Sequence, residues 1–230
     1  MEAIVLAGGL GTRLRGVVAD LPKAMAPVNG RPFLAYLLDG LIAAEFDAAI
    51  LAVGYMSEKI REHFGERYRS LPLRYSMERE PLGTGGAIKL AMTHVSTSTV
   101  FVANGDTYLE LDYGVMLAEH QRARSCLTIA VQTVSDAGRY GALDIDAGHI
   151  RGFLEKGRPG PGPINAGVYL LSKELLDRYP LPPAFSLETD LLMRYVKDIA
   201  PLAFPAQGIF IDIGVPEDYA RAQNLFRARP

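Results

Sequence analysis

The sequence contains a single cysteine and no long uninterrupted apolar stretch. With Cys126 alone, no disulfide can form within the chain and no zinc site can be built from several thiolates. No apolar run reaches the roughly 18 residues that a membrane span needs, and the first residues lack the basic segment and cleavage site of a secretory signal. These absences predict a cytoplasmic protein that does not bind a membrane.

The sequence also lacks an excess of charge of either sign. It has 24 basic and 26 acidic residues, so the formal net charge is only -2. A protein without a basic field has no general attraction for a polyanion, and we therefore expect no nucleic acid partner. The histidines show no metal-ligand spacing, and we expect them at the surface or at helix caps; they are His63, His94, His120 and His149.

Apolar runs alternate with amphipathic segments along the first part of the chain. This alternation is typical of a parallel sheet covered by helices. It predicts strands at 2–7, 48–53, 73–77, 99–103 and 126–133, with Cys126 buried in the last of these. It predicts helices at 32–45, 57–64, 84–92 and 111–122.

The pattern changes after about residue 138. Strands are expected at 140–146, 149–155 and 165–171, with a surface loop at the glycine- and proline-rich run 157–163. Helices at 172–178 and 187–196, a strand at 209–213 and a helix from 216 complete the prediction. We expect one α/β domain over residues 1–230, with a Rossmann-like, mainly parallel sheet flanked by helices and a smaller β-rich insertion.

The glycine-rich run from Leu6 to Leu14 directly follows the first predicted strand. Its glycines allow a tight turn whose N–H groups can face an anion, and Arg13 adds a fixed positive fork suited to phosphate oxygens. The spacing is neither G-x-G-x-x-G nor G-x-x-x-x-G-K-[ST]. Lys23 follows about ten residues later, in Leu-Pro-Lys-Ala-Met. The run predicts a phosphate-binding loop.

Two aspartates follow or end apolar strands that lie far apart in the sequence. Asp106 comes after the run 99–103, where ligands gather in open α/β sheets, and could hold Mg²⁺ against phosphates. Asp212 interrupts the apolar run 209–213, where an ionised carboxylate needs a compensating cation or hydrogen bonds. The residues alone leave two other interpretations open, an ordinary turn at Asp106 and a solvent-facing Asp212.

The motif G-G-L-G-T-R-L followed by P-K-x-M resembles the signature of the sugar-1-phosphate nucleotidyltransferase family. The resemblance implies that Arg13 and Lys23 act on the reacting phosphates and that Asp106 and Asp212 bind Mg²⁺. It implies a nucleotide-binding loop made of Leu6, Ala7, Gly8, Gly9, Gly11, Thr12 and Arg13. The chain departs from the family pattern at Gly16-Val17-Val18, where members often have Pro-Leu-Thr, and at Ala24, where proline is common.

Further matches divide the chain into a nucleotide-binding half, about 1–137, and a sugar-binding half, about 138–230, which carries the second metal aspartate. The run 80–87 resembles the family's base-binding turn. The implied nucleotide contacts there and after the fourth strand are Pro81, Gly83, Thr84, Gly85, Asn104 and Gly105. The implied sugar contacts are Gly141, Glu155, Asn165 and Gly167, and Lys156 would contact the sugar phosphate as a catalytic residue.

Within the family, the chain most resembles the guanylyltransferases of heptose 1-phosphates. This implies GTP and D-glycero-α-D-manno-heptose 1-phosphate as substrates, release of pyrophosphate, and a role in surface polysaccharide synthesis. Other substrates stay open: mannose, glucose or an amino sugar 1-phosphate with GTP, dTTP or UTP. So do a catalytically silent regulator of the same fold and a dinucleotide-dependent oxidoreductase, which the missing G-x-G-x-x-G disfavours. A homo-oligomer is possible.

Overall fold

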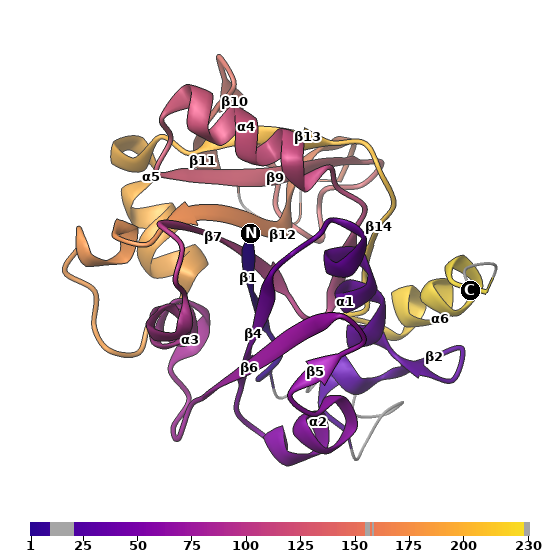
Figure 1. Ribbon diagram of the computed structural model, residues 1–230. Coiled ribbons are helices and arrows are strands. Elements are labelled where there is room, and N and C mark those ends of the chain that lie inside the picture. Colours follow the sequence, from indigo (N-terminus) through magenta and orange to yellow (C-terminus); the bar gives the residue numbers. More distant parts are fainter. Residues whose placement is uncertain (10–20, 155–156, 158, 228–230) are drawn as a thin grey trace.

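A ten-stranded mixed sheet forms the centre of the molecule (Figure 1). The computed structural model describes residues 1–9, 21–154, 157 and 159–227. The strand order is β10-β11-β13-β9-β12-β7-β1-β4-β6-β5. None of the helices in the described ranges is long and apolar enough to cross a bilayer.

The first half of the chain supplies the parallel part of the sheet. It consists of β1 (Glu2–Leu6), β4 (Ala48–Val53), β6 (Leu71–Met77) and β7 (Thr99–Asn104). β1 pairs in parallel with both β4 and β7, and β5 (Arg67–Tyr68) closes the edge beside β6. Because parallel strands run in one direction, their carboxyl ends meet at one edge of the sheet, where the candidate site is built.

The second half extends the same sheet instead of forming a separate layer. β12 (Gly162–Ser172) runs antiparallel to β7 on one side and to β9 (Leu127–Val134) on the other. β13 (Leu202–Ala206) lies parallel to β9, and the hairpin of β10 (Leu143–Asp146) and β11 (His149–Phe153) completes that edge.

Helices cover both faces of the sheet, and strand alternation decides which side chains meet them. On β1, Ala3 and Val5 belong to one buried cluster and Ile4 to the other. The first cluster includes α1 (Phe33–Ala43), α2 (Ser57–Phe64), α4 (Tyr113–Ala123) and α6 (Pro216–Leu225). The second includes α3 (Gly83–Ala91), the π-helix η5 (Leu187–Met193) and α5 (Arg194–Ile199). Figure 1 shows α1 and α3 on opposite sides of the parallel strands.

Short elements complete the chain and carry two of the candidate side chains. β8 (Thr107–Leu109) and β14 (Phe210–Asp212) form a two-stranded antiparallel sheet, and β2 (Pro27–Val28) pairs with β3 (Arg31–Pro32). Single-turn 3₁₀ helices are η2 (Lys23–Met25), η3 (Met92–His94) and η4 (Leu175–Asp177). β8 and β14 place Asp212 beside Thr107, immediately after Asp106.

The predicted fold class is confirmed, and several local predictions are wrong. The helix expected at 172–178 is only the 3₁₀ turn η4. β9 begins after Cys126, which is only partly buried. His120 is neither a surface nor a cap residue, since it is 3% exposed and its Nδ1 lies 2.8 Å from Thr128 Oγ1. The surface expectation failed because α4 turns His120 toward the sheet.

Candidate active site

Lys23 lies between the two aspartates that the sequence singles out. Its ammonium donates to the Asp106 carboxylate, and Nζ is 3.8 Å from Asp212 Oδ1. The 3₁₀ turn η2 holds the lysine in place because its neighbours Ala24 and Met25 are buried. The Lys23 side chain is only 12% exposed. The structure therefore brings together three predicted residues that are up to 189 positions apart in the sequence.

Asp106 follows β7 in a tight turn against the end of β1. The Gly105 N–H donates to the Leu6 carbonyl at 2.9 Å, and a Cβ on Gly105 would lie 2.6 Å from that same oxygen. Only glycine fits so close to the Leu6 carbonyl, so the backbone geometry requires glycine at position 105 whether or not a ligand binds. The turn directs the Asp106 side chain to Lys23.

Asp212 ends β14, and its surroundings disfavour the ionised form. Burial raises the pKa of Asp212, the charge of Asp106 raises it further, and the Lys23 ammonium partly offsets both effects. The Gly214 N–H also donates to Asp212 Oδ1 at 2.7 Å. The two carboxylates thus repel each other on either side of the Lys23 ammonium, an arrangement that gains free energy from additional positive charge.

The donor set suits a hard divalent cation such as the Mg²⁺ that the sequence predicts. Among the described residues, no group of three or more His, Cys, Asp or Glu side chains could hold a metal ion by itself. Mg²⁺ is commonly held by one or two carboxylates, with water and substrate phosphates as the other ligands. Asp106 and Asp212 fit that pattern, because each is partly exposed, at 32% and 27%.

The beginning of the glycine-rich run lies beside these charges. The Ala7 N–H donates to the Ala52 carbonyl at 2.8 Å, and Leu6 pairs with Asn104 across β1 and β7. A Cβ on Gly8 would lie 3.0 Å from Gly54 N, whereas no described residue would meet a Cβ on Gly9. Gly8 is therefore closely packed. Gly11, Thr12 and Arg13 lie outside the described residues.

Glu78 is a carboxylate near this loop that the sequence interpretation missed. It is the first residue after β6, and its Oε1 would lie 3.1 Å from a Cβ on Gly8. Its Oε2 accepts from the Leu82 N–H at 3.2 Å. The signal that could have identified Glu78 is its place at the carboxyl end of a parallel strand, next to Pro81 and the rest of the predicted base-binding turn.

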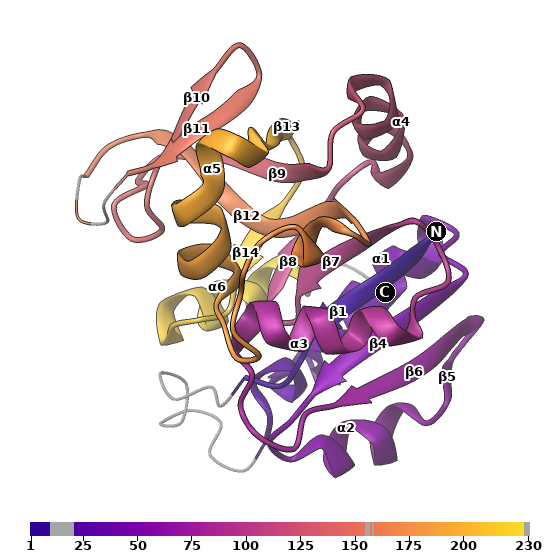
Figure 2. The same ribbon diagram turned by 90° about the vertical axis from the view of Figure 1, so that its left-hand side faces the viewer.

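The glycines of the turn at 83–86 are packed against the segment before η5. A Cβ on Gly83, whose φ is +70°, would lie 2.5 Å from the Phe185 carbonyl oxygen. A Cβ on Gly85 would overlap the Phe185 ring. The Gly85 N–H donates to the Phe185 carbonyl at 3.0 Å, and Thr84 Oγ1 accepts from the Leu187 N–H at 2.9 Å. Figure 2 shows this segment descending to α3. Packing against Phe185 therefore requires glycine at positions 83 and 85, independently of the nucleotide role predicted for them.

Of the predicted sugar contacts, Asn165 and Gly167 lie on β12, and Gly141 lies in the turn that follows β9. Asn165 Oδ1 accepts from the Gly167 N–H at 3.0 Å. Gly167 has a φ of +72°, and a Cβ there would lie 2.7 Å from Asn104 Nδ2, so β12 comes close to β7 at this point. Gly141 is half-buried and next to Ala142, which bridges to Ile164. Glu155 and Lys156 lie outside the described residues.

Arg139 approaches Asp212 from the turn before Gly141. Its guanidinium donates to Asp218 and to the Tyr140 hydroxyl, and its positive charge lowers the pKa of Asp212 against the effect of burial. Asp218 lies in the first turn of α6 and is buried. The sequence interpretation assigned no role to Arg139, because Asp218 is 79 positions away.

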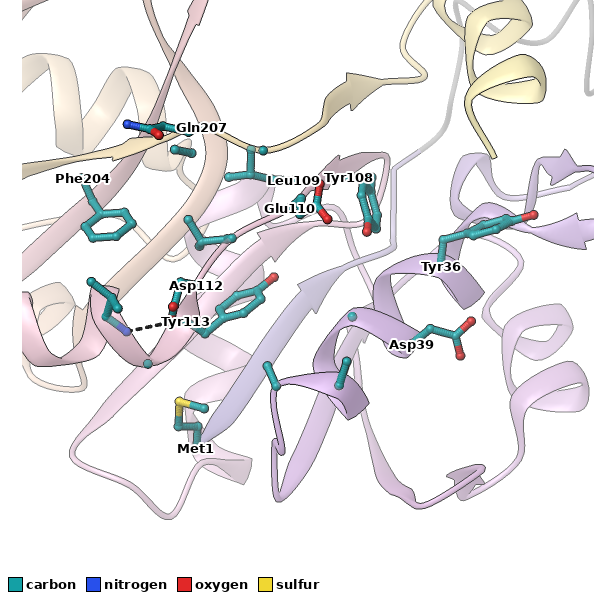
Figure 3. Close-up of a pocket in the computed structure, with 18 of the residues that line it drawn as sticks. Met1, Tyr36, Asp39, Tyr108, Leu109, Glu110, Asp112, Tyr113, Phe204 and Gln207 are labelled. Carbon is teal, nitrogen blue, oxygen red and sulfur yellow. Dashed lines mark hydrogen bonds between the residues drawn. The ribbon is translucent and has the colours of Figure 1, made fainter. Parts of the chain in front are cut away.

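A cavity of about 1160 Å³ lies apart from these residues (Figure 3). Its lining includes Met1, Tyr36, Asp39, Tyr113 and Phe204, and it contains none of the predicted site residues. Figure 3 shows Tyr36 and Asp39 projecting from α1 and Phe204 from β13. The charged cluster around Lys23 has the chemistry for phosphates, so we place the candidate active site there and not in this cavity.

The glycine-rich motif, the Lys23 cluster and the parallel part of the sheet are together typical of a nucleotide-binding protein. The family model for nucleotidyl transferases matches residues 2–229, and the chain belongs to that family.

Curated relatives are similar over most of this chain. The D-glycero-α-D-manno-heptose 1-phosphate guanylyltransferase of Aneurinibacillus thermoaerophilus is 41% identical over 224 residues, with 97% of each chain covered. The mannose-1-phosphate guanylyltransferase catalytic subunit beta of Xenopus tropicalis is 33% identical over 233 residues, covering 98% of this chain and 64% of that protein.

Solved structures are also similar over nearly the whole chain. The crystal structure of HddC from Yersinia pseudotuberculosis has a TM-score of 0.88 and 40% identity, with 98% of this chain and 99% of that chain covered. The structure of HddC complexed with GMP-PN has a TM-score of 0.87 at the same identity and coverage. The similarity therefore extends over both parts of the sheet.

Proposed function

We propose that this enzyme transfers GMP from GTP to D-glycero-α-D-manno-heptose 1-phosphate, releasing pyrophosphate and forming a GDP-heptose. The observation that carries the proposal is the cluster of Lys23, Asp106 and Asp212 at the carboxyl edge of the sheet, beside the glycine-rich run. Its substrate assignment is supported by full-length similarity to a heptose 1-phosphate guanylyltransferase.

The reaction needs no covalent intermediate with the protein. A phosphate oxygen of the sugar 1-phosphate attacks the α-phosphorus of GTP in line. Pyrophosphate leaves as the bond between the α-phosphorus and the oxygen that bridges it to the β-phosphorus breaks. The main obstacle is the crowding of negative charge, so positioning and electrostatic stabilisation supply most of the catalysis. In our proposal Lys23, Arg13 and Lys156 place positive charge on the reacting phosphates.

Asp106 and Asp212 would hold Mg²⁺. The bound ion would neutralise charge on the phosphate oxygens. With the ion in place, the Lys23 ammonium would be released from Asp106 to contact a substrate phosphate. Lys23 would thus neutralise the aspartates in the absence of the ion, and would act on the substrate phosphates once Mg²⁺ takes over that role.

The choice of guanine is supported by Glu78. Guanine has adjacent N1–H and N2–H₂ donors, and a carboxylate accepts both in a paired arrangement. Glu78 lies beside Gly8 and the turn at Pro81–Thr84, where we place the base, together with Gly85 and Asn104. Uracil and thymine have only one N–H donor on their pairing edge, so they would leave one carboxylate oxygen without a partner.

The sugar is assigned to the second half of the chain. We propose that Gly141, Glu155, Asn165 and Gly167 surround it, so that residues 1–137 bind mainly the nucleotide and residues 138–230 mainly the sugar. A heptose is favoured over mannose because the heptose enzyme matches this chain more closely and over 97% of its own length, against 64% for the mannose enzyme. We place the reaction in the cytoplasm, in the supply of activated heptose for surface polysaccharide.

Pyrophosphate release from pairs of nucleotide and sugar 1-phosphate tests the proposal. GTP with the manno-configured heptose 1-phosphate is expected to give the highest kcat/KM, and GTP with mannose 1-phosphate a lower but measurable value. Activity confined to UTP or dTTP would contradict the substrate assignment, and no activity with any pair would support a catalytically silent protein.

A further inference from the structure

Glu188 joins the turn that we propose for the base to the strand that carries Asn165. Its carboxylate accepts three hydroxyl groups. Oε2 accepts from Thr84 Oγ1 at 2.8 Å and from Ser186 Oγ at 3.1 Å. Oε1 accepts from the Tyr169 hydroxyl at 3.4 Å. One side chain thus contacts α3, β12 and the start of η5.

The carboxylate determines the direction of the hydrogen bonds on the sugar side. An ionised carboxylate only accepts, so the Tyr169 hydroxyl directs its proton to Glu188 and its lone pairs to Asn165. Asn165 Nδ2 donates to the Tyr169 oxygen at 2.8 Å, and Asn165 Oδ1 accepts from the Gly167 N–H at 3.0 Å. The orientation of the Asn165 amide therefore follows from the charge on Glu188.

Tyr169 connects the Glu188 carboxylate to the Asn165 amide through hydrogen bonds of fixed direction. It is 1% exposed, and its pKa is raised by burial and further by the negative charge of Glu188. The hydroxyl therefore keeps its proton at any physiological pH. A buried neutral hydroxyl with two defined partners has a single hydrogen-bonding arrangement.

The other carboxylate oxygen fixes the nucleotide side. Thr84 Oγ1 donates to Glu188 and accepts from the Leu187 N–H, so both of its hydrogen-bonding directions are set. The N–H groups of Gly85 and Gly86 donate to the Phe185 carbonyl at 3.0 and 3.3 Å. Glu188 and the backbone before it thereby hold the turn in one position.

We infer that Glu188 is a positioning residue that orients both substrate sites at once. It holds the Thr84 turn on the nucleotide side and, through Tyr169, the amide of Asn165 on the sugar side. The inference depends on the proposed function, because the roles of Thr84 and Asn165 belong to it.

Glu188→Gln separates the two sides. The glutamine side chain keeps one acceptor oxygen. We expect this oxygen to take the place of Glu188 Oε2, because two hydroxyl groups donate there. Its NH₂ then faces Tyr169, whose hydroxyl must accept and direct its proton to Asn165. The Asn165 amide turns over in response, and its NH₂ meets the Gly167 N–H, a contact between two donors.

The experiment measures both KM values by pyrophosphate release, with the melting temperature of every variant. Glu188→Gln and Tyr169→Phe are expected to raise the KM of the sugar phosphate roughly fivefold and to leave the KM of GTP within about twofold. Glu188→Ala is expected to raise both. In the double variant that combines Glu188→Gln with Tyr169→Phe, the KM of the sugar phosphate should be no higher than in either single variant, since both changes break the same link.

Asp190→Asn is the matched control. Asp190 lies in the same π-helix, and its carboxylate accepts from the Ser186 N–H at 2.7 Å, a bond that the asparagine oxygen can still accept. Among the described residues it has no hydrogen bond to Thr84, Tyr169 or Asn165. Both KM values should stay near those of the unmodified enzyme.

A folded Glu188→Gln variant with an unchanged sugar KM, or with only the GTP KM raised, overturns the inference. If Glu188→Ala does not fold, Glu188→Gln and Tyr169→Phe decide the question alone. The proposed function is judged separately, on the unmodified enzyme. If that enzyme prefers another pair of substrates, the substrate assignment fails, and the KM comparison is made with the preferred pair.

Discussion

Replacing Lys23 by methionine tests the charge balance of the candidate active site. The variant removes the ammonium from between two carboxylates while keeping most of the side-chain volume. The attraction between Lys23 Nζ and Asp212 Oδ1 at 3.8 Å amounts to about 4 kcal/mol at an effective dielectric constant of roughly 20. The aspartates are partly exposed, so we expect a net loss of about 1–2 kcal/mol in folding free energy.

This loss corresponds to a fall in melting temperature of about 2–8 °C for a chain of this size. Catalysis should suffer more, because the same ammonium stabilises the reacting phosphates. We expect kcat/KM to fall about a hundred- to a thousandfold, as for loss of a preorganised donor. Added Mg²⁺ should raise the melting temperature of the variant more than that of the unmodified protein, since the ion replaces the missing charge.

Steady-state pyrophosphate release and thermal unfolding, each with and without Mg²⁺, provide the assay. Lys89→Met is the control, because Lys89 pairs with Asp177 at 2.8 Å in an exposed salt bridge. It should change neither activity nor the response to Mg²⁺. Near-normal turnover by the Lys23→Met variant would contradict a catalytic role for Lys23, and so would an activity loss that only follows unfolding.

Three further predictions concern individual side chains. Asp212→Asn should lower kcat about a hundredfold or more, with partial rescue by raised Mg²⁺ or by Mn²⁺; full activity at low Mg²⁺ would contradict a shared metal. Glu78→Gln should reduce the preference for GTP over UTP by about tenfold in kcat/KM, whereas Glu80→Gln, in the same turn but exposed, should leave it unchanged. Burial lowers the pKa of His120, so the unfolded chain binds more protons than the folded protein below about pH 6.5. The free energy of unfolding should therefore decrease as the pH is lowered through this range. His120→Gln should flatten that dependence in denaturant titrations, and the exposed His94→Gln should not.

Periodicity and turn chemistry predicted the parallel part of the sheet well. The strand at 48–53 and the helix at 57–64 have the predicted limits. β13 was missed because Leu202–Ala206 contains Pro205, which cannot donate to a ladder. The structure accommodates it because β13 pairs with β9 along its length but with β11 only at Leu202, so the Pro205 nitrogen can face the free edge.

Contacts between distant residues set the limit of the sequence prediction at the site. The motifs identified Lys23, Asp106 and Asp212, which the structure brings together. Glu188 was missed because its partner Thr84 is 104 positions away and nothing local marks a carboxylate in an amphipathic helix as functional. The π-helical geometry of η5 was also unpredictable, since tertiary packing and not local propensity selects it.

The substrate preference of the enzyme is measured by the rate of pyrophosphate release with GTP, UTP, dTTP and ATP, each paired with heptose, mannose and glucose 1-phosphate. The proposed function predicts the highest kcat/KM for GTP with D-glycero-α-D-manno-heptose 1-phosphate, in a reaction that depends on Mg²⁺ and is strongly reduced in the Lys23→Met and Asp212→Asn variants. A preference for a pyrimidine nucleotide or for glucose 1-phosphate, or turnover that does not need Lys23 and Asp212, would contradict it.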